Sequence, residues 1–120
     1  MTKNRIYEHA DNLKVAVTQP ATPSSGDPVL YGQRPGVALT DEGTDGETSV
    51  RFKGAFELEA EAVDGVGNSA IAEGDILYYD SAAAIKINKD DTNGVRYGYA
   101  GPGGALVAGA SGNITVILGF

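Results

Sequence analysis

Few side chains in this 120-residue chain are spaced for catalysis or metal binding. His9 is the only histidine and there is no cysteine, so a hydrolytic triad or a multi-histidine metal site would have to be built around one residue near the start of the chain. No Gly-Lys dipeptide occurs, so the phosphate-binding G-x-x-x-x-G-K-[ST] loop is absent. We therefore expect no enzymatic activity and no cofactor.

Two acidic segments, Asp41–Glu47 and Asp90–Gly94, have the composition of calcium-binding loops. Aligned to an EF-hand loop by their glycines, they place Phe52 and Ala100 at the position that requires a bidentate glutamate. We interpret both segments as solvated turns, the second of them ending in an Asn-Gly hairpin signal. Cation binding stays an alternative, and we predict no metal site.

Residues 65–70 spell the dinucleotide-binding pattern G-x-G-x-x-A. A dinucleotide site needs a helix after the glycines, whereas Gly74-Asp75 follows within a few residues and would break one. We therefore predict a loop there. Asn113-Ile114-Thr115 spells a glycosylation sequon, but its alternating apolar neighbours make it the start of a strand.

The charge balance argues against nucleic acid and membranes as partners. Asp and Glu outnumber Lys and Arg 16 to 9, for a formal net charge of −7, so the long-range field repels phosphate backbones and anionic lipids. No apolar run is long enough to span a bilayer, and the first residues lack the apolar region of a signal peptide. We expect a soluble protein made in a cytoplasm.

The elements that position these residues are predicted to be strands. The 17 glycines are scattered along the chain, which indicates many turns, and apolar residues alternate between them. Such short strands predict an all-β fold, a small barrel or sandwich with little helix; residues 81–85 are expected to form one short turn of helix. We predict an irregular N-terminal arm over residues 1–13 and a single β domain over residues 14–120. The expected strands are Leu13–Val17, Val29–Tyr31, Val37–Leu39, Val50–Leu58 as the clearest, Ile76–Tyr79, Ile85–Ile87, Val95–Tyr99 and Ile114–Leu118.

The chain also resembles itself. Gly26–Tyr31 is echoed by Gly74–Tyr79, and each copy is followed by a Gly-x-Ala segment and then by a longer alternating segment. The later pairs are Gly36–Ala38 with Gly98–Ala100 and Gly46–Phe52 with Gly112–Leu118. Two copies are too few for a solenoid, so we predict two similar β units that share one core.

Four segments, in this order, resemble the small capsid cement or head decoration proteins of tailed bacteriophages. The resemblance runs from about Val17 to the end of the given sequence, and the order of the motifs is more specific than any one of them. The four segments are Ser25–Val29, Gly36–Asp41, Gly54–Leu58 and Ala70–Asp80.

This resemblance implies a β-rich homotrimer that binds the major capsid protein on the exterior of the expanded head and stabilises the head against internal pressure. Members have also been labelled RecA- or RadA-like phage recombinases, a label that the missing phosphate loop argues against. A free module that binds glycans or a host surface is the other alternative. The polar arm residues expected to contact the capsid or a neighbouring subunit are Lys3, Asn4, Arg5, Ile6 and Tyr7.

Overall fold

The computed structural model describes residues 12–118, and these form nine strands and no helix. The strands are β1 (Asn12–Val15), β2 (Pro28–Tyr31), β3 (Arg34–Ala38), β4 (Thr48–Arg51), β5 (Ala55–Glu61), β6 (Ile76–Tyr79), β7 (Ile87–Asn88), β8 (Val95–Ala100) and β9 (Ser111–Leu118). The predicted all-β fold class is confirmed. Residues 81–85, expected to form one short turn of helix, instead lie in non-helical turns and bends between β6 and β7.

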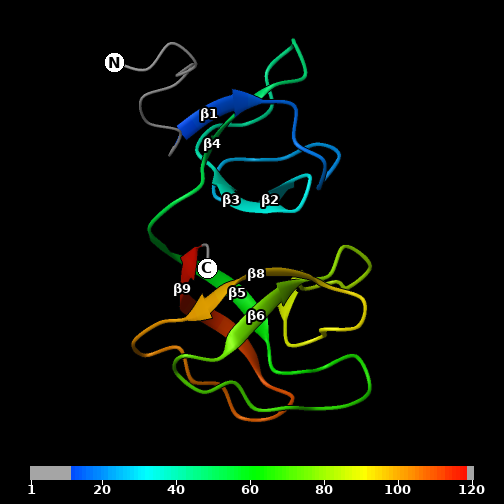
Figure 1. The fold of residues 1–120 in the computed structure, drawn as a ribbon, viewed down its shortest axis with the longest axis vertical. Coiled ribbons are helices and arrows are strands. Elements are labelled where there is room, and N and C mark those ends of the chain that lie inside the picture. The colour runs from blue at the N-terminus through cyan, green and yellow to red at the C-terminus, as the bar shows by residue number, and fades with distance from the viewer. Residues whose placement is uncertain (1–11, 119–120) are drawn as a thin grey trace, which may run out of the picture.

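The strands fall into two groups, which lie at opposite ends of the long axis (Figure 1). The first unit, residues 12–52, is a four-stranded antiparallel sheet in the order β1-β4-β3-β2. In the barrel, residues 55–118, five strands close in the order β5-β7-β6-β8-β9. Its longest ladder is antiparallel and pairs all seven residues of β5 with β9.

The predicted internal repeat is confirmed by the strand pairing. In the first unit β1 pairs with β4, β4 with β3, and β3 with β2. In the barrel β5 pairs with β9, β9 with β8, and β8 with β6, so four strands of each group follow the same path. The barrel differs by the two-residue strand β7, which lies between β5 and β6.

The equivalence extends to single hydrogen bonds at the Gly-Asp turns. Gly26 and Gly74 have φ angles of 88° and 85°, and their amides donate to the carbonyls of Ala38 and Ala100, both at 2.7 Å. A left-handed backbone at this position favours glycine, which explains why the residue recurs. The pairing of the two segments is equivalent up to Val29 and Leu77, which lie opposite Gly36 and Gly98; beyond Leu77 the register of β6 against β8 shifts.

The prediction of one long strand over Val50–Leu58 is wrong. The chain leaves the first unit after Arg51 and enters the barrel at Ala55, so the alternating residues belong to two strands in different sheets. Gly54 has a φ of 112°, outside the extended region of L residues, and the strand ends there. Apolar alternation persists across the break because each half faces its own core: Phe52 is buried in the first unit and Leu58 in the barrel.

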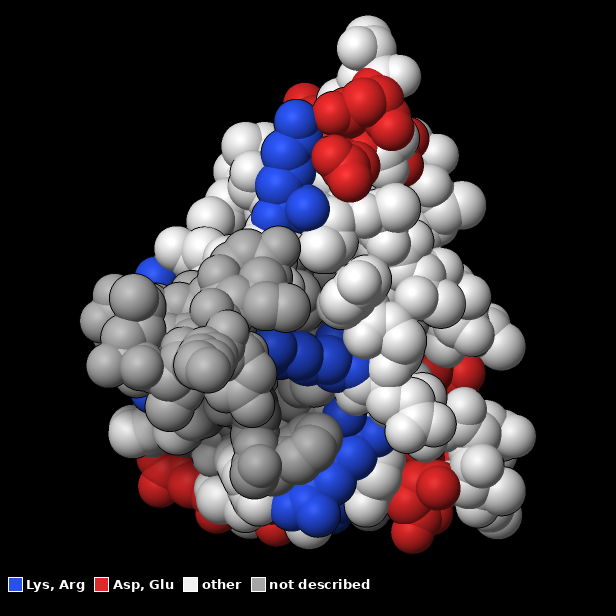
Figure 2. All heavy atoms as spheres, turned by 45° about the horizontal axis from the view of Figure 1, so that its top comes forward, with Lys and Arg blue, Asp and Glu red and all other residues white. Residues whose placement is uncertain are grey.

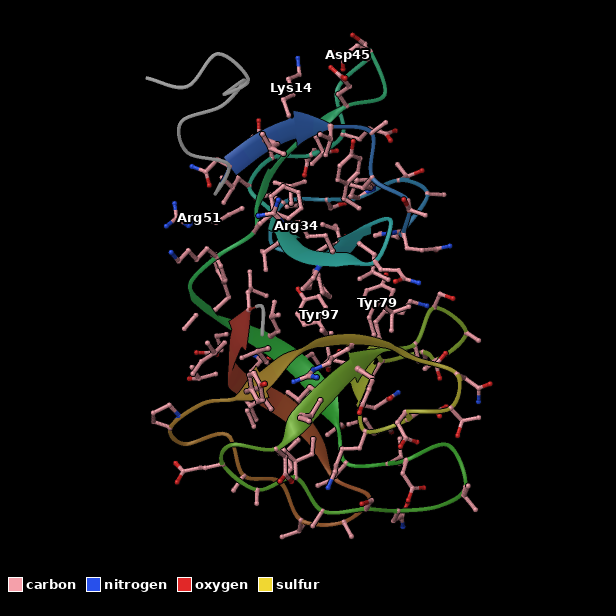
Figure 3. The ribbon with its side chains drawn as sticks, viewed as in Figure 1. Lys14, Arg34, Asp45, Arg51, Tyr79 and Tyr97 are labelled. Atoms are coloured by element: carbon pink, nitrogen blue, oxygen red, sulfur yellow. The ribbon has the colours of Figure 1, made fainter. Side chains whose placement is uncertain are left out.

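Tyrosines of the barrel join it to the first unit. The fully buried Tyr97 of β8 donates its hydroxyl hydrogen to the carbonyl of Gly36 in β3 at 2.5 Å. Its ring stacks on that of Tyr79 with centroids 6.1 Å apart, and both rings point toward the first unit (Figure 3). Leu30 and Val37 of the first unit lie in the same apolar cluster as the barrel interior. The single shared core that the repeat predicted is present only in part, because Val29, Ala38, Val50 and Phe52 form a separate cluster within the first unit.

Candidate functional site

The arm residues predicted to make contacts, Lys3 to Tyr7, lie outside the described residues. The acidic segments do lie within them, and both are turns. Asp45 Oδ1 accepts the amide of Glu47 at 3.0 Å, and Asp90 Oδ1 accepts the amides of Thr92 and Asn93, each at 3.1 Å. Over residues 12–118 no group of three or more acidic or histidine side chains is arranged to hold a metal ion.

Basic side chains of the first unit are engaged by their neighbours. Figure 2 shows Lys and Arg side chains along the part of the molecule where this unit lies, with acidic side chains at its tip. Lys14 pairs with Asp45 at 2.9 Å, and hydrogen bonding to that carboxylate raises the pKa of Lys14. Arg51 Nε donates to a backbone carbonyl at 3.0 Å, and the Arg34 guanidinium lies 4.3 Å from the ring centroid of Phe52. These contacts do not form a cradle for a phosphate or a carboxylate.

Two loops at the far end of the barrel from the first unit carry no charged side chain over residues 65–72 and 101–110 (Figure 1). Two antiparallel hydrogen bonds of 2.9 Å between Ile71 and Leu106 join them, and Ala62 bonds to Gly109 and Ala110 at 2.8 Å. We call these two segments the charge-free end. No charged residue follows Arg96 in the sequence, in a chain of net charge −7.

The first of these loops presents Val66, whose side chain is 98% exposed. Asp64 holds the turn: its Oδ1 accepts the amides of Val66 at 3.1 Å and Gly67 at 2.9 Å. These bonds lower the pKa of Asp64, and Gly65 supplies the left-handed residue, with a φ of 87°. The turn is thus fixed by its own hydrogen bonds, and it holds an aliphatic side chain out in water.

The second loop presents Val107 in the same way, with 76% of the side chain exposed. The amide of Ala110 donates to the carbonyl of Val107 at 2.9 Å across a turn in which Gly109 has a φ of 81°. A Cβ at Gly109 would lie 2.8 Å from the side-chain nitrogen of Asn68, so the two turns are in contact. Two adjoining turns thus each expose an aliphatic side chain, which makes this end of the barrel a candidate contact surface.

Two hollows flank the barrel. One, of about 300 Å³, lies between the turn at Gly26–Pro28 and strand β5, and Lys86 reaches its wall with its ammonium held by the carbonyls of Ser81 and Ala83. The other, of about 380 Å³, is lined by Glu73 and Gly74 ahead of β6, by Ala100, Gly101 and Pro102 at the end of β8, and by Ile117 of β9. Neither brings together a nucleophile and a base.

Comparison with protein families identifies the class. A family model described as phage cement protein matches residues 7–119. The chain therefore belongs to the phage cement protein family, a family of structural components of the phage capsid. No curated protein and no solved structure matches it. Residues 12–118 contain no helix, and so no helix that could cross a membrane.

The exposed valines were not among the residues that sequence reasoning selected. Residues 65–70 were predicted to form a loop, which is confirmed, but nothing in the pattern G-x-G-x-x-A says which side chain stays in water. The stronger signal was available: the sequence carries no charge after Arg96, although the protein as a whole is acidic. Part of that run is buried in β8 and β9, and the loop between these strands carries much of the rest to the surface.

Proposed function

We propose that this protein is a capsid cement protein that binds the exterior of the expanded phage head and stabilises it against internal pressure. Its partner is the major capsid protein, and it acts as a homotrimer without catalysis. The observation that carries the proposal is the family match over residues 7–119. The neutral, aliphatic contact surface and the lack of a catalytic arrangement among residues 12–118 support it.

The mechanism is thermodynamic linkage. A protein that binds the expanded lattice and not its separated subunits stabilises that lattice by mass action, with no change in any covalent bond. We assign the charge-free end to the contact with the head, because Val66 and Val107 gain most by leaving water there. Glu57 and Glu59, which are exposed on β5, then remain solvated on the side of the barrel.

The arm and the trimer complete the proposal. Five residues ahead of β1, namely Lys3, Asn4, Arg5, Ile6 and Tyr7, are assigned to a contact with the head or a neighbouring subunit. Three chains on one site multiply a weak contact of each chain through effective concentration, which suits a surface that presents many identical sites.

The test mixes the purified protein with expanded heads of its phage that lack it. Co-sedimentation measures binding, and light scattering on heating measures the temperature at which the heads break. We expect saturable binding at a fixed ratio to the major capsid protein and a higher disruption temperature. Absence of binding by the folded protein would refute the proposal.

A matched pair of variants tests whether the charge-free end is the surface that contacts the head. Val66→Lys with Val107→Lys places two charges on the charge-free end, and we expect binding about tenfold weaker or worse because apolar contact is replaced by buried charge. Thr44→Lys adds a charge to the exposed loop between β3 and β4, and should bind as the unmodified protein does. Equal loss in both variants would mean that the contact surface has been misassigned.

A further inference from the structure

The two units of the chain meet end to face. Tyr79 and Tyr97 lie buried at the end of the barrel that points toward the first unit (Figure 3). They share one apolar cluster with Leu30 and Val37, which are each 3% exposed, whereas a chain neighbour of each lies in the first unit's own cluster. Leu30 and Val37 therefore belong to the outer face of β2 and β3, and an end of one unit covers a sheet face of the other.

The barrel has a counterpart of that covered face. Pro28 pairs with Val37 across β2 and β3, and Ile76 pairs with Tyr99 across β6 and β8 at the equivalent register. The outer face of β6 and β8 consists of Ile76, Tyr78 and Tyr99, which are all only half-buried. β6 and β8 are the two barrel strands that do not pair with β5, so this face lies away from the exposed glutamates of β5. The barrel thus leaves open the face that the first unit buries.

The first unit has a counterpart of the covering end. Tyr31 follows Val29 by two residues on β2, as Tyr79 follows Leu77 on β6, so the two tyrosines are equivalent. Tyr79 is 1% exposed beneath the first unit, whereas Tyr31 is 43% exposed. The ring of Tyr31 lies 6.2 Å from that of Phe52, centroid to centroid, at the edge of the first unit's own core. We call this place the Tyr31 end.

We infer that the Tyr31 end of one copy binds the outer face of β6 and β8 in a second copy, so that the junction within the chain recurs between chains. The inference rests on the proposed function, of which the homotrimer is a part, and deepens it by naming the two surfaces that meet. A contact between two different surfaces closes into a ring where the rotation allows it. Three copies then form a ring of six units.

Charge favours this contact over one between two barrels. The first unit is nearly neutral, with four basic and five acidic side chains over residues 12–53, whereas residues 54–118 carry three basic and nine acidic. Two barrels would repel each other through their like charge. Arg34, whose guanidinium lies 4.3 Å from the ring centroid of Phe52, instead brings a positive charge to the Tyr31 end.

The contact between chains should be weaker than the junction within the chain. In the barrel the register shifts between Leu77 and Tyr78, which leaves Tyr97 without a partner on β6, and its hydroxyl reaches the carbonyl of Gly36. β2 and β3 pair without such a shift, so the first unit has no counterpart of Tyr97. The Tyr31 end therefore lacks this hydrogen bond, and we expect copies to associate reversibly.

Cross-linking tests which surfaces meet. The chain has no cysteine, so Tyr31→Cys and Ile76→Cys each place a single thiol, one on each surface. We expect a bismaleimide to join positions 31 and 76 in a mixture of the two variants, both at high concentration in solution and on expanded heads, and to join neither variant to itself. Thr44→Cys, on the exposed loop between β3 and β4, is the control and should not be joined to position 76.

A matched pair of substitutions tests the strength of the contact. Tyr31→Glu places a carboxylate against the acidic barrel of the second copy, and we expect the association constant from sedimentation velocity to fall about tenfold or more. Leu39→Glu is the control, because Leu39 is 42% exposed and lies at the opposite end of β3 from the Tyr31 end. It should associate as the unmodified protein does. Melting temperatures show whether each variant is folded.

The outcomes separate the inference from the proposed function. If copies associate but positions 31 and 76 are not joined and folded Tyr31→Glu associates equally well, the homotrimer uses other surfaces and the inference fails alone. A thiol at position 31 that reacts only after deletion of residues 1–8 would show that the chain's own arm covers Tyr31, and would also overturn it. If positions 31 and 76 are joined but the protein does not bind expanded heads, the cement role falls and the inference stands.

Discussion

The hydroxyl of Tyr97 is a polar group in the apolar junction of the two units. Its side chain is fully buried, and burial raises its pKa well above the ordinary value of 10.0. The neighbouring Tyr79 has its pKa raised to about 12, chiefly by burial as well. Both hydroxyls therefore stay protonated to a more alkaline pH than that of an exposed tyrosine, and over that range the hydroxyl of Tyr97 remains a donor to Gly36.

Tyr97→Phe should cost about 1 to 2 kcal/mol of unfolding free energy, because it removes the donor to the Gly36 carbonyl without changing the ring. Urea denaturation measures the loss. Tyr99→Phe is the matched control: its hydroxyl accepts from Arg96 at the surface, and we expect a change below about 0.5 kcal/mol. Equal effects in the two variants would contradict a special role for the junction.

Aspartates that accept backbone hydrogen bonds make stability depend on pH. The bond from the amide of Ala72 is the main cause that lowers the pKa of Asp75 below 3.8, and bonds from Gly67 and Asn93 act likewise on Asp64 and Asp90. The unfolded chain therefore binds protons more readily than the folded one in acid. The stabilisation is complete above the unfolded pKa and is lost as the pH falls through the folded one.

We expect unfolding free energy to decrease as the pH is lowered from about 5 to about 2, as followed by urea titration at each pH. Asp75→Asn keeps an acceptor for the Ala72 amide but cannot titrate, so its curve should fall less steeply than that of the unmodified protein. A Glu59→Gln variant, altered at an exposed site on β5, serves as the control. If the unfolding free energy of all three proteins fell with pH at the same slope, titration of Asp75 would not be the cause of the pH dependence.

Close packing of strands explains two glycines that turns do not require. Gly36 in β3 and Gly98 in β8 are counterparts, and neither has a positive φ. A Cβ at Gly98 would lie 2.1 Å from the carbonyl oxygen of Ile117, and one at Gly36 would lie 2.5 Å from a methyl of Val50. The Gly-x-Ala pattern that marked the repeat in sequence therefore records a steric requirement.

Gly98→Ala should destabilise the fold by at least about 2 kcal/mol, because a backbone carbonyl cannot move aside as a flexible side chain does. Gly67→Ala is the control, since a Cβ there has no atom within 4 Å and the residue has no positive φ; we expect a change within about 0.5 kcal/mol. Thermal denaturation of both proteins measures the difference in stability. A Gly98→Ala protein as stable as the control would mean that β9 adjusts at little cost.

Local sequence patterns predicted a strand well where all the buried residues of the alternating segment face the same core. Ile76–Tyr79 was predicted with its observed bounds, and the repeat was visible because each Gly-Asp turn specifies its own backbone. The break at Gly54 was missed because alternation runs through it with the same period on both sides.

On the scale of the whole molecule, charge is divided between the units. Residues 12–53 carry four basic and five acidic side chains, whereas residues 54–118 carry three basic and nine acidic. The barrel therefore holds most of the negative charge, and its charge-free end is the exception within it. Copies bound at high density would repel one another through their barrel sides at low ionic strength.

Deletion of residues 1–8 should weaken binding to expanded heads while the melting temperature stays nearly unchanged, because β1 begins only at Asn12. Co-sedimentation and calorimetry on the same preparations give the two quantities. A truncated protein that binds as tightly as the full chain would rule out the arm, and a large drop in melting temperature would assign it a structural role instead.

The pairing of β5 with β9 governs how the chain reaches this shape. Residues 55–61 pair with residues 111–117, so the partners lie at least 50 residues apart in sequence, and the barrel cannot close until β9 has been synthesised. The first unit pairs Asn12 with Arg51 and has all its strands much earlier. Such non-local pairing is slow to form, on the order of milliseconds to seconds. During that interval the first unit exposes the apolar face that Tyr97 later covers. A chaperone that binds apolar surface would therefore act on the chain before the barrel closes.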